Sequence, residues 1–340
     1  MHEWHAGVQQ LFYLAVATSF LVAYLATPQV RKLALKVGVL DEVGERRMHS
    51  EPKPRIGGIA VYLGLASALF VTIGLALHTT LFHSAKDTQD FFGLLFGGTL
   101  IMLVGVWDDI MGMRPRNKFL AQIIVAIVSM IYGFHIPGFE VPGSEHHYVN
   151  LPFWIDYPLT LVWYLGMMNA INFLDGLDGL LAGVTAISGV FLFAIASSHE
   201  QIGAALVLCT LVGGALGFLP YNFSPAKIFL GDTGSLFIGY VFATVSLLIT
   251  AKIAVTVSLL VPLLALALPV IDTAAAILRR FRAGKAITEA DRGHFHHILV
   301  FRFGLGVKQA VLLIYVVSFL LGAAAYLLSG SAHVHFASLI

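Results

Sequence analysis

Long apolar runs alternate with short polar loops along the whole chain. Ten runs of roughly 16 to 25 residues are each long enough to cross a hydrocarbon core of about 30 Å as a helix. They span residues 8–27, 57–77, 91–107, 119–133, 155–171, 180–197, 202–220, 234–250, 254–278 and 308–328. The pattern predicts an all-α polytopic membrane protein with about ten transmembrane helices, built as a single integral membrane domain over residues 1–340.

Composition supports this prediction and excludes a soluble domain. Of the 340 residues, 58% are hydrophobic and only 11% are charged, a balance that soluble domains do not have. The first five residues lack the basic region that begins a signal peptide, so we expect the first apolar run to remain as a span. The single cysteine, Cys209, excludes a disulfide within the chain.

Basic residues are confined almost entirely to alternate loops. Eighteen of the 20 Lys and Arg residues lie in loops 28–56, 108–118, 221–233 and 279–308. These loops share one side of the membrane if ten spans alternate, and the positive-inside rule makes that side cytoplasmic. Both termini are then external. We expect the functional site on the cytoplasmic face, with membrane lipid and no nucleic acid as a partner.

The most informative polar segment is NAINFLDGLDGL, residues 169–180, at the end of an apolar run. Asn169, Asn172, Asp175 and Asp178 recur at a spacing of three, so the first three can share one broad helical face. The glycines among them predict that the helix ends here and unwinds into a tight turn. Amide and carboxylate oxygens gathered there suit a hard cation and the hydrogen-bonding edge of a ligand. The alternative is a polar loop between two spans.

Three further acids lie at the edges of apolar runs. Asp108 and Asp109 end the third run. Because adjacent carboxylates repel each other, one of them can hold a proton, as a general base requires. Asp232 lies between glycines in FLGDTGS, where the backbone N–H groups of a helix start can bind phosphate. The alternatives are a solvated helix end for the pair and a helix cap for Asp232.

The first cytoplasmic loop carries a basic segment, RRMHSEPKPRIGG. Its candidate phosphate contacts are Arg46, His49, Lys53 and Arg55. The alternative roles of such a loop are to fix the topology and to touch anionic lipid.

The last cytoplasmic loop combines histidines with arginines. His294, His296 and His297 follow Arg292 closely. A structural zinc site needs a fourth ligand and usually thiolates, so this arrangement favours pyrophosphate over metal. Asp272, inside the ninth apolar run, is an intramembrane acid that we expect to be functional or paired with an arginine.

Taken together, the cytoplasmic edges supply acids and amides on one hand and a cationic cluster on the other. Hard oxygen ligands that share a cation with substrate phosphates are the way proteins usually bind Mg²⁺. The sequence therefore predicts a phosphoryl-type transfer at the membrane face, where positioning and charge neutralisation supply most of the catalysis.

Five motifs, in this order along the chain, resemble those of the polyprenyl-phosphate N-acetylhexosamine-1-phosphate transferases. They are RRMHSEPKPRIGG, WDD with RNKFLAQ, NAINFLDGLDGLLAG, FLGDTGSLFIG and DRGHFHHIL, and they cover residues 28–308 approximately. The last motif is similar to that of the WecA/TagO branch, which uses UDP-N-acetylglucosamine (UDP-GlcNAc). The MraY branch, which takes UDP-MurNAc-pentapeptide, has a proline before a run of three histidines, and this chain does not.

The resemblance implies a reaction and its partners. UDP-GlcNAc and undecaprenyl phosphate would give undecaprenyl-pyrophosphoryl-GlcNAc and UMP at the bacterial inner membrane, as the first membrane step of a cell-envelope glycan pathway such as lipopolysaccharide or teichoic acid synthesis. The implied cofactor is Mg²⁺, with Mn²⁺ as an alternative. The resemblance also suggests a homodimer.

The resemblance also implies roles for individual residues. Asp108 and Asp109 would be the catalytic acids, with Asp108 deprotonating the lipid phosphate, and Asp232 and Asn172 would lie at the metal. The nucleotide would be bound by Lys118, Asp175, Asp178 and Phe229, with Asp178 reading the uracil and Phe229 stacking on it. The expected contacts to pyrophosphate and sugar are His294, His296, His297, Arg292, Arg279 and Arg280, and those to the lipid phosphate are Arg46, His49 and Arg55.

Other functions stay open at this point. The same chemistry with another UDP-N-acetylhexosamine, including UDP-MurNAc-pentapeptide, is one alternative. A cation-coupled transporter would need acids and broken helices near the middle of the bilayer, whereas these acids cluster at one edge. A lipid-binding scaffold would tolerate replacement of the acids.

Overall fold

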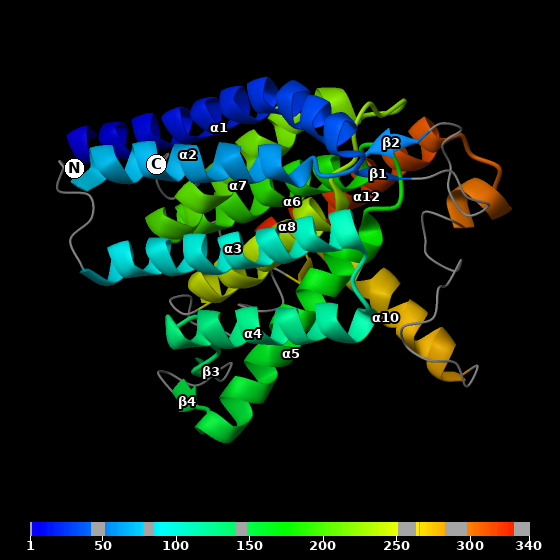
Figure 1. Cartoon of the computed structure of the whole chain (residues 1–340). Coiled ribbons are helices and arrows are strands. Elements are labelled where there is room, and N and C mark those ends of the chain that lie inside the picture. Colours follow the sequence, from blue (N-terminus) through cyan, green and yellow to red (C-terminus); the bar gives the residue numbers. More distant parts are fainter. Residues whose placement is uncertain are drawn as a thin grey trace.

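The computed structural model describes residues 2–41, 52–77, 85–140, 148–250, 263–264, 266–282 and 298–329. These residues form a bundle of long helices with two very small sheets (Figure 1). The helices are α1 (His2–Val37), α2 (Gly58–Leu77), α3 (Ala85–Met111), α4 (Pro115–Ile131), α5 (Phe153–Leu174), α6 (Leu180–Ser198), α7 (Ile202–Asn222), α8 (Gly231–Thr250), α10 (Ala267–Arg282), the short π-helix η1 (Ile298–Arg302) and α12 (Val307–Leu328). The prediction of an all-α membrane protein is confirmed.

Seven of the helices found in the described residues are long and apolar enough to cross a membrane, namely α1, α2, α3, α6, α7, α8 and α12. Two more of the predicted spans, 119–133 and 155–171, fall largely on α4 and α5. The predicted span 254–278 lies partly outside the described residues, and its later part belongs to α10. The described helices therefore follow the apolar runs of the sequence.

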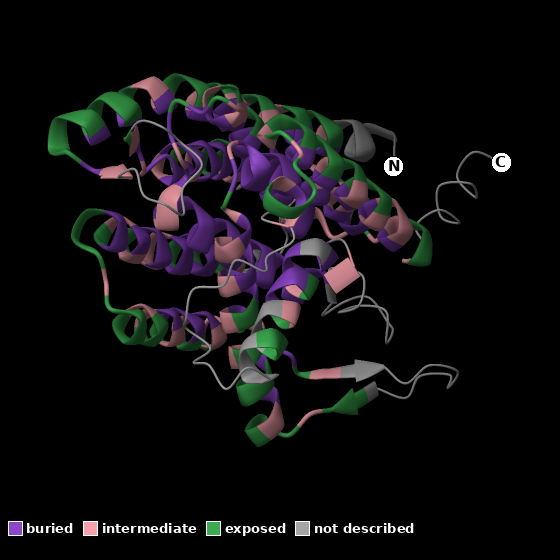
Figure 2. Cartoon of the chain, turned by 90° about the vertical axis from the view of Figure 1, so that its right-hand side faces the viewer, coloured by how far each residue is buried: buried purple, intermediate pink, exposed green. Residues whose placement is uncertain are grey.

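Helix α8 forms the centre of the bundle. It packs against α2, α3, α5, α6 and α7, while α1 lies along α2 and α7, and α12 lies along α6. Burial follows this arrangement, because buried residues fill the space between helices and exposed residues face outward (Figure 2). Helix α10 leans away from the other helices at one end of the bundle (Figure 1).

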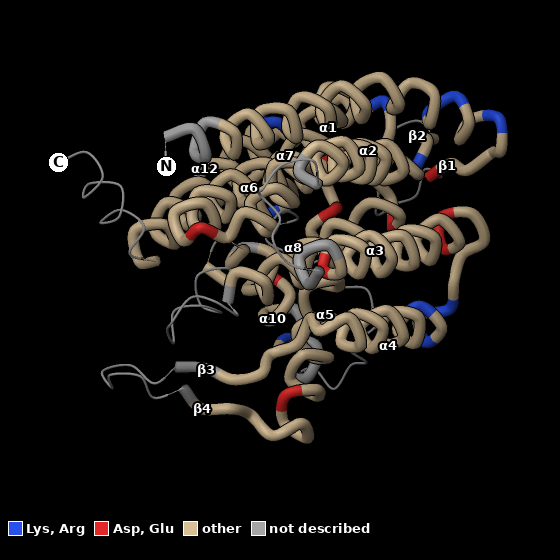
Figure 3. The backbone as a smooth tube through the Cα atoms, turned by 90° about the vertical axis from the view of Figure 1, so that its left-hand side faces the viewer, with Lys and Arg blue, Asp and Glu red and all other residues tan. Residues whose placement is uncertain are grey.

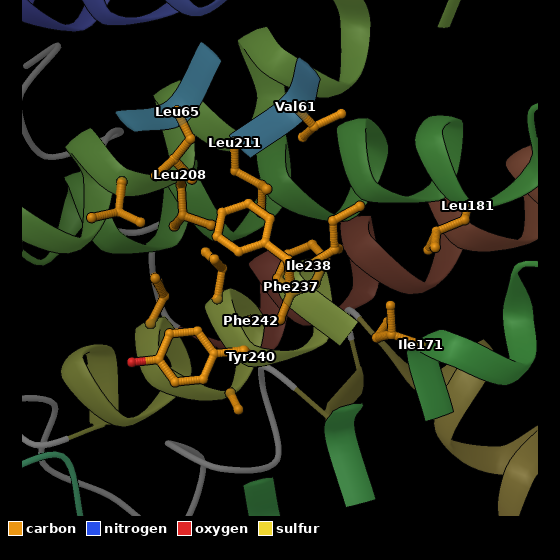
Figure 4. Packing of buried hydrophobic residues seen from close by; sticks show 14 of the residues in the cluster. Val61, Leu65, Ile171, Leu181, Leu208, Leu211, Phe237, Ile238, Tyr240 and Phe242 are labelled. Carbon is orange, nitrogen blue, oxygen red and sulfur yellow. The ribbon is translucent and has the colours of Figure 1, made fainter. Parts of the chain in front are cut away.

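The core around α8 is built from large apolar side chains. Phe237, Tyr240 and Phe242 of α8 are almost completely buried, and they meet Leu65 of α2 and Leu208 of α7 in one cluster (Figure 4). Lipid tails are as apolar as these side chains, so close van der Waals packing between the helices stabilises such a cluster in a membrane. A rigid core at this place holds the first turn of α8 in a defined position.

Two short antiparallel pairs of strands close the ends of the bundle. Strands β1 (Leu40–Asp41) and β2 (Lys53–Pro54) pair with Asp41 opposite Lys53. Strands β3 (Gly138–Glu140) and β4 (Tyr148–Asn150) form a hairpin in the Pro- and Gly-rich loop between α4 and α5.

The turn predicted after Asn169 is confirmed. Helix α5 ends at Leu174, and α6 begins at Leu180 after a tight segment. Gly179 has a φ of +82°, which is a left-handed conformation that favours glycine. The turn leaves Asp175 and Asp178 outside both helices, at the same end of the bundle as the last turn of α3.

Candidate active site

Asp109 caps the first turn of α8. Its carboxylate accepts hydrogen bonds from the backbone N–H of Asp232 at 3.1 Å, and from the backbone N–H and the hydroxyl of Thr233 at 2.9 and 2.6 Å. A carboxylate at a helix N-terminus is stabilised by the unpaired N–H groups and by the helix dipole. Asp109, 4% exposed, therefore fixes α8 against the end of α3.

Glycine allows these elements to approach so closely. A Cβ on Gly231, whose φ is +70°, would lie 2.4 Å from a carboxylate oxygen of Asp109. A Cβ on Gly58 at the start of α2 would lie 2.1 Å from the backbone nitrogen of Gly234. The three helix ends of α2, α3 and α8 thus meet backbone to backbone, which holds the acids of FLGDTGS and WDD in fixed positions.

Lys118 joins the two other acids of this region. Its Nζ atom lies 2.6 Å from Oδ2 of Asp232 and 3.0 Å from Oδ2 of Asp108. The other carboxylate oxygen of Asp108 accepts the backbone N–H of Met113 at 2.6 Å. Residues of α3, α4 and α8 that lie up to 124 positions apart in the sequence therefore form one charged cluster.

Asn172 brings α5 into the same cluster. Its Nδ2 atom donates hydrogen bonds to Oδ1 of Asp232 and, at 2.7 Å, to Oγ of Ser235. One turn earlier, Asn169 donates to the side-chain carbonyl of Gln122 on α4 at 2.7 Å. The two amides predicted to share a helical face therefore both face the inside of the bundle.

Asp175 has an unusual protonation equilibrium. Burial, followed by repulsion from nearby carboxylates of which Asp232 is the strongest, raises the pKa of Asp175 to about 8. At neutral pH this carboxyl group keeps its proton. Asp175 can then donate a hydrogen bond to a phosphate or sugar oxygen, which an ionised carboxylate cannot do.

Asp178 and Phe229 belong to a second cluster beside the first. Asp178 accepts the backbone N–H of Ala226 at 2.8 Å and lies 3.6 Å from Nζ of Lys53. The same ammonium lies over the ring of Phe229, 5.3 Å from its centroid. A carboxyl group and an aromatic ring side by side are the groups that bind the edge and the face of a nucleobase.

Arg55 links the loop between α1 and α2 to the acids. Its guanidinium donates to the backbone carbonyl of Asp109 at 2.9 and 3.2 Å, and it lies 3.5 Å from a carboxylate oxygen of Asp41.

Asp41 was not among the predicted site residues, because no motif distinguishes it from other loop acids. Tyr315 of α12 was missed for the same reason, although its hydroxyl donates to the carbonyl of Gly179 at 2.5 Å.

Several predicted contacts lie outside the described residues. They are Arg46, His49, Arg292, His294, His296 and His297. Of the arginine pair on α10, Arg279 is exposed, and the side chain of Arg280 is outside the described residues. Asp272 is buried on the same helix.

The cluster supplies some, but not all, of the oxygen ligands that a divalent cation needs. Within the described ranges, no three His, Cys, Asp or Glu side chains are placed to hold a metal ion by themselves. Asp108 and Asp232 already share one cation, the ammonium of Lys118. Mg²⁺ usually takes one or two carboxylates and completes its shell with water and substrate phosphates, so the carboxylate of Asp232 fits this ion. The amide N–H group of Asn172 holds that carboxylate in place.

Comparison with known proteins agrees with the resemblance of the motifs. Residues 91–250 match the model of glycosyl transferase family 4. A probable undecaprenyl-phosphate N-acetylglucosaminyl 1-phosphate transferase of Bacillus subtilis is 35% identical, over 94% of this chain and 85% of that protein. A decaprenyl-phosphate N-acetylglucosaminephosphotransferase of Mycolicibacterium smegmatis is 34% identical, over 88% of this chain and 77% of that protein.

A relative from the other branch is also similar. The phospho-N-acetylmuramoyl-pentapeptide-transferase of Bacillus thuringiensis is 31% identical, over 74% of this chain and 76% of that protein. The match therefore extends to both branches, with the larger share of the chain matched by the N-acetylglucosamine enzymes. The chain belongs to the polyprenyl-phosphate N-acetylhexosamine-1-phosphate transferases of glycosyl transferase family 4, in the WecA/TagO-like branch.

Proposed function

We propose that this protein transfers GlcNAc-1-phosphate from UDP-GlcNAc to undecaprenyl phosphate. An oxygen of the lipid phosphate forms a new bond to the phosphorus that carries the sugar. The bond from this phosphorus to the bridging oxygen of the diphosphate breaks, and UMP leaves with that oxygen. The products are undecaprenyl-pyrophosphoryl-GlcNAc and UMP.

The observation that carries this proposal is the cluster of Asp108, Lys118, Asn172 and Asp232 from four separate helices. Phosphoryl transfer needs a base for the attacking group and positive charge around the phosphates. Asp108, 8% exposed, would take the proton of the lipid phosphate. Lys118 would neutralise charge on the diphosphate as it leaves the carboxylates that now hold it.

The second cluster would bind the nucleotide. The N3–H group of uracil is a donor that the carboxylate of Asp178 can accept, and the ring of Phe229 offers a stacking face. Along the chain, Asp175 lies between Asn172 of the first cluster and Asp178 of the second. Its proton at neutral pH suits a contact to a phosphate oxygen. One turn therefore serves both ends of the UDP group.

Mg²⁺ would be held by Asp232 with Asn172 nearby. When bound, this ion supplies charge neutralisation for phosphate oxygens in the transition state. Removal of Mg²⁺ should therefore abolish turnover, and Mn²⁺ should replace it in part because it accepts the same oxygen ligands.

The proposed topology places these clusters at the cytoplasmic face of the bacterial inner membrane. It has ten spans and external termini, and it is supported by the position of 18 of the 20 basic residues in loops of one side. Lys and Arg residues gather at the end of α1, beside β2 and at the start of α4, close to acids at the end of α3 (Figure 3). UDP-GlcNAc would arrive from the cytosol, and the lipid phosphate would lie at headgroup depth.

The test is a substrate panel with purified protein and undecaprenyl phosphate. UDP-GlcNAc, UDP-GalNAc and UDP-MurNAc-pentapeptide are compared by the rate of UMP release at a range of Mg²⁺ concentrations. We expect UDP-GlcNAc to react fastest, and we expect Asp232→Asn to need more Mg²⁺ or to lose activity. A higher rate with UDP-MurNAc-pentapeptide would assign the other branch, and an unchanged Mg²⁺ titration would remove Asp232 from the metal site.

A further inference from the structure

Lys53 lies between Asp178 and Phe229, the two residues that we assign to binding of the uracil ring. Its ammonium is 3.6 Å from the carboxylate of Asp178 and 5.3 Å from the centroid of the Phe229 ring. Both side chains of the ion pair are mostly buried, with exposed fractions of 18% for Lys53 and 17% for Asp178. The ammonium therefore covers the groups with which a uracil ring would interact.

The backbone holds Lys53 and Phe229 together. The N–H group of Phe229 donates to the carbonyl of Pro54 at 2.8 Å, and the N–H group of Gly57 donates to the carbonyl of Phe229 at 2.9 Å. Strand β2 and the segment before α8 thus form one small structure, in which the backbones of Arg55 and Phe229 also pair as a parallel β-bridge. The backbone of Lys53 cannot leave the ring without breaking these bonds, so only its side chain is free to change position.

Ligand and ammonium compete for the same partners. The carboxylate of Asp178 can accept either the ammonium or the N3–H group of a base, and the ring of Phe229 can face either a cation or a second ring. Lysine carries its charge on a flexible stem with four carbons. An ammonium displaced by the base would move toward the strongest negative charge that arrives with the ligand, which is the diphosphate.

We propose that Lys53 is a displaceable cation of the nucleotide pocket. It pairs with Asp178 and covers Phe229 while the pocket is empty, and it pairs with the phosphates once the base has taken its place. This inference rests on the proposed function, because it takes Asp178 and Phe229 as the residues that bind uracil. It adds Lys53 as the residue that makes the pocket select a nucleotide over its nucleoside.

The proposal predicts opposite effects of Lys53→Met on two ligands. Uridine has no phosphate, so it must displace the ammonium without offering it a new partner. The variant should therefore bind uridine about threefold more tightly. UDP loses a charged contact to its phosphates, so the variant should bind UDP about tenfold more weakly. Isothermal titration calorimetry on the full-length protein in nanodiscs measures both dissociation constants.

Two variants serve as controls. Lys227→Met removes an exposed lysine from the α7–α8 loop, which also carries Phe229, and should leave both dissociation constants near those of the wild type. Lys53→Arg keeps the positive charge and should keep most of the affinity for UDP. Lys53→Gln should reproduce the effects of Lys53→Met, so a folding defect of one variant does not decide the result.

The outcomes separate this inference from the proposed function. If Lys53→Met weakens uridine and UDP by the same factor, Lys53 only holds the loop in place and the inference is wrong. If the wild type binds UDP and the variant changes neither affinity, the inference is also wrong, while the proposed function stands. If the wild type binds neither ligand, the proposed function and this inference both fail.

Discussion

The ammonium of Lys118 lies 2.6 Å from the carboxylate of Asp232, which joins the first turn of α4 to the first turn of α8. The same ammonium lies 3.0 Å from Asp108 at the end of α3. Without this cation, two carboxylates would face each other in a partly desolvated place. The ion pair therefore joins the three helices, and in the proposed function it places a positive charge where the phosphates of the substrate would bind.

Replacement of Lys118 tests this dual role. Lys118→Met removes the partner of two carboxylates, which should lower the free energy of unfolding by about 3 kcal/mol when no divalent cation is present. Mg²⁺ should recover more stability in this variant than in the wild type, because the ammonium no longer competes for the oxygens. Melting temperatures in EDTA and in Mg²⁺ measure both effects.

Lys227→Met is the matched control, since Lys227 is exposed in the loop between α7 and α8. It should melt like the wild type in both buffers. A melting temperature of Lys118→Met in EDTA equal to that of the wild type would show that the ion pair does not stabilise the site.

Asp108→Asn should reduce turnover by at least about a hundredfold, because the amide cannot accept the proton of the lipid phosphate. Binding of UMP should change little, since Asp108 lies in the acid cluster and not beside Asp178. Rates of UMP release and titrations of UMP binding distinguish these two effects. Glu200→Gln, an exposed acid in the loop between α6 and α7, is the control, and retention of the wild-type rate by Asp108→Asn would remove this residue from the mechanism.

Asp109 should act mainly through stability. Asp109→Ala removes the acceptor of three hydrogen bonds at the start of α8, and we expect a loss of about 2 kcal/mol in the free energy of unfolding. Asp109→Asn keeps one side-chain acceptor and should cost less, and Thr233→Val removes a single hydroxyl contact and should cost about 1 kcal/mol. Reversible unfolding in mixed micelles gives these values, and equal stability of all three variants and the wild type would exclude the cap.

The raised pKa of Asp175 predicts how the stability of the protein changes with pH. Its pKa is about 8 in the folded protein and about 3.9 in an unfolded chain. Between these values the folded state binds the extra proton, so the contribution of Asp175 to stability is full below about pH 4 and is lost as the pH rises through 8. The melting temperature of the wild type should therefore fall between pH 5 and 9 more steeply than that of Asp175→Asn.

The comparison is made on the same buffers for both proteins. Glu200→Gln, which removes an exposed acid, should keep the slope of the wild type. A wild-type melting temperature that rises with pH over this interval, or a slope that Asp175→Asn does not change, would contradict the protonated state of Asp175.

The sequence predicted those features that depend on local pattern. Apolar runs located the described helices, and the glycines after Asn172 located the turn between α5 and α6. The predicted start of the eighth span at residue 234 was late, because α8 already begins at Gly231. Its polar first turn is stabilised by Asp109, a residue 124 positions away, and no local pattern contains that contact.

Helix α1 shows the same limit. The apolar run indicated a span over 8–27, but the helix continues through Pro28 to Val37. Its last turns carry basic residues that extend beyond the hydrocarbon, and Arg31 donates to the carbonyl of Lys227 at 3.2 Å. Contacts of this kind, like that of Lys53 with Phe229, arise from packing between distant segments, which periodicity does not encode.

The most direct test of the central claim follows the β-phosphorus of UDP-GlcNAc. Protein reconstituted with undecaprenyl phosphate and Mg²⁺ is given UDP-GlcNAc labelled with ³²P at that atom, and the label is counted in the lipid and aqueous fractions. We predict that the label enters the lipid fraction in equal amount to the UMP released, and that Asp108→Asn abolishes both. Label that stays in aqueous UDP, or lipid labelling that Asp108→Asn leaves unchanged, would contradict a phosphoglycosyl transfer at this site.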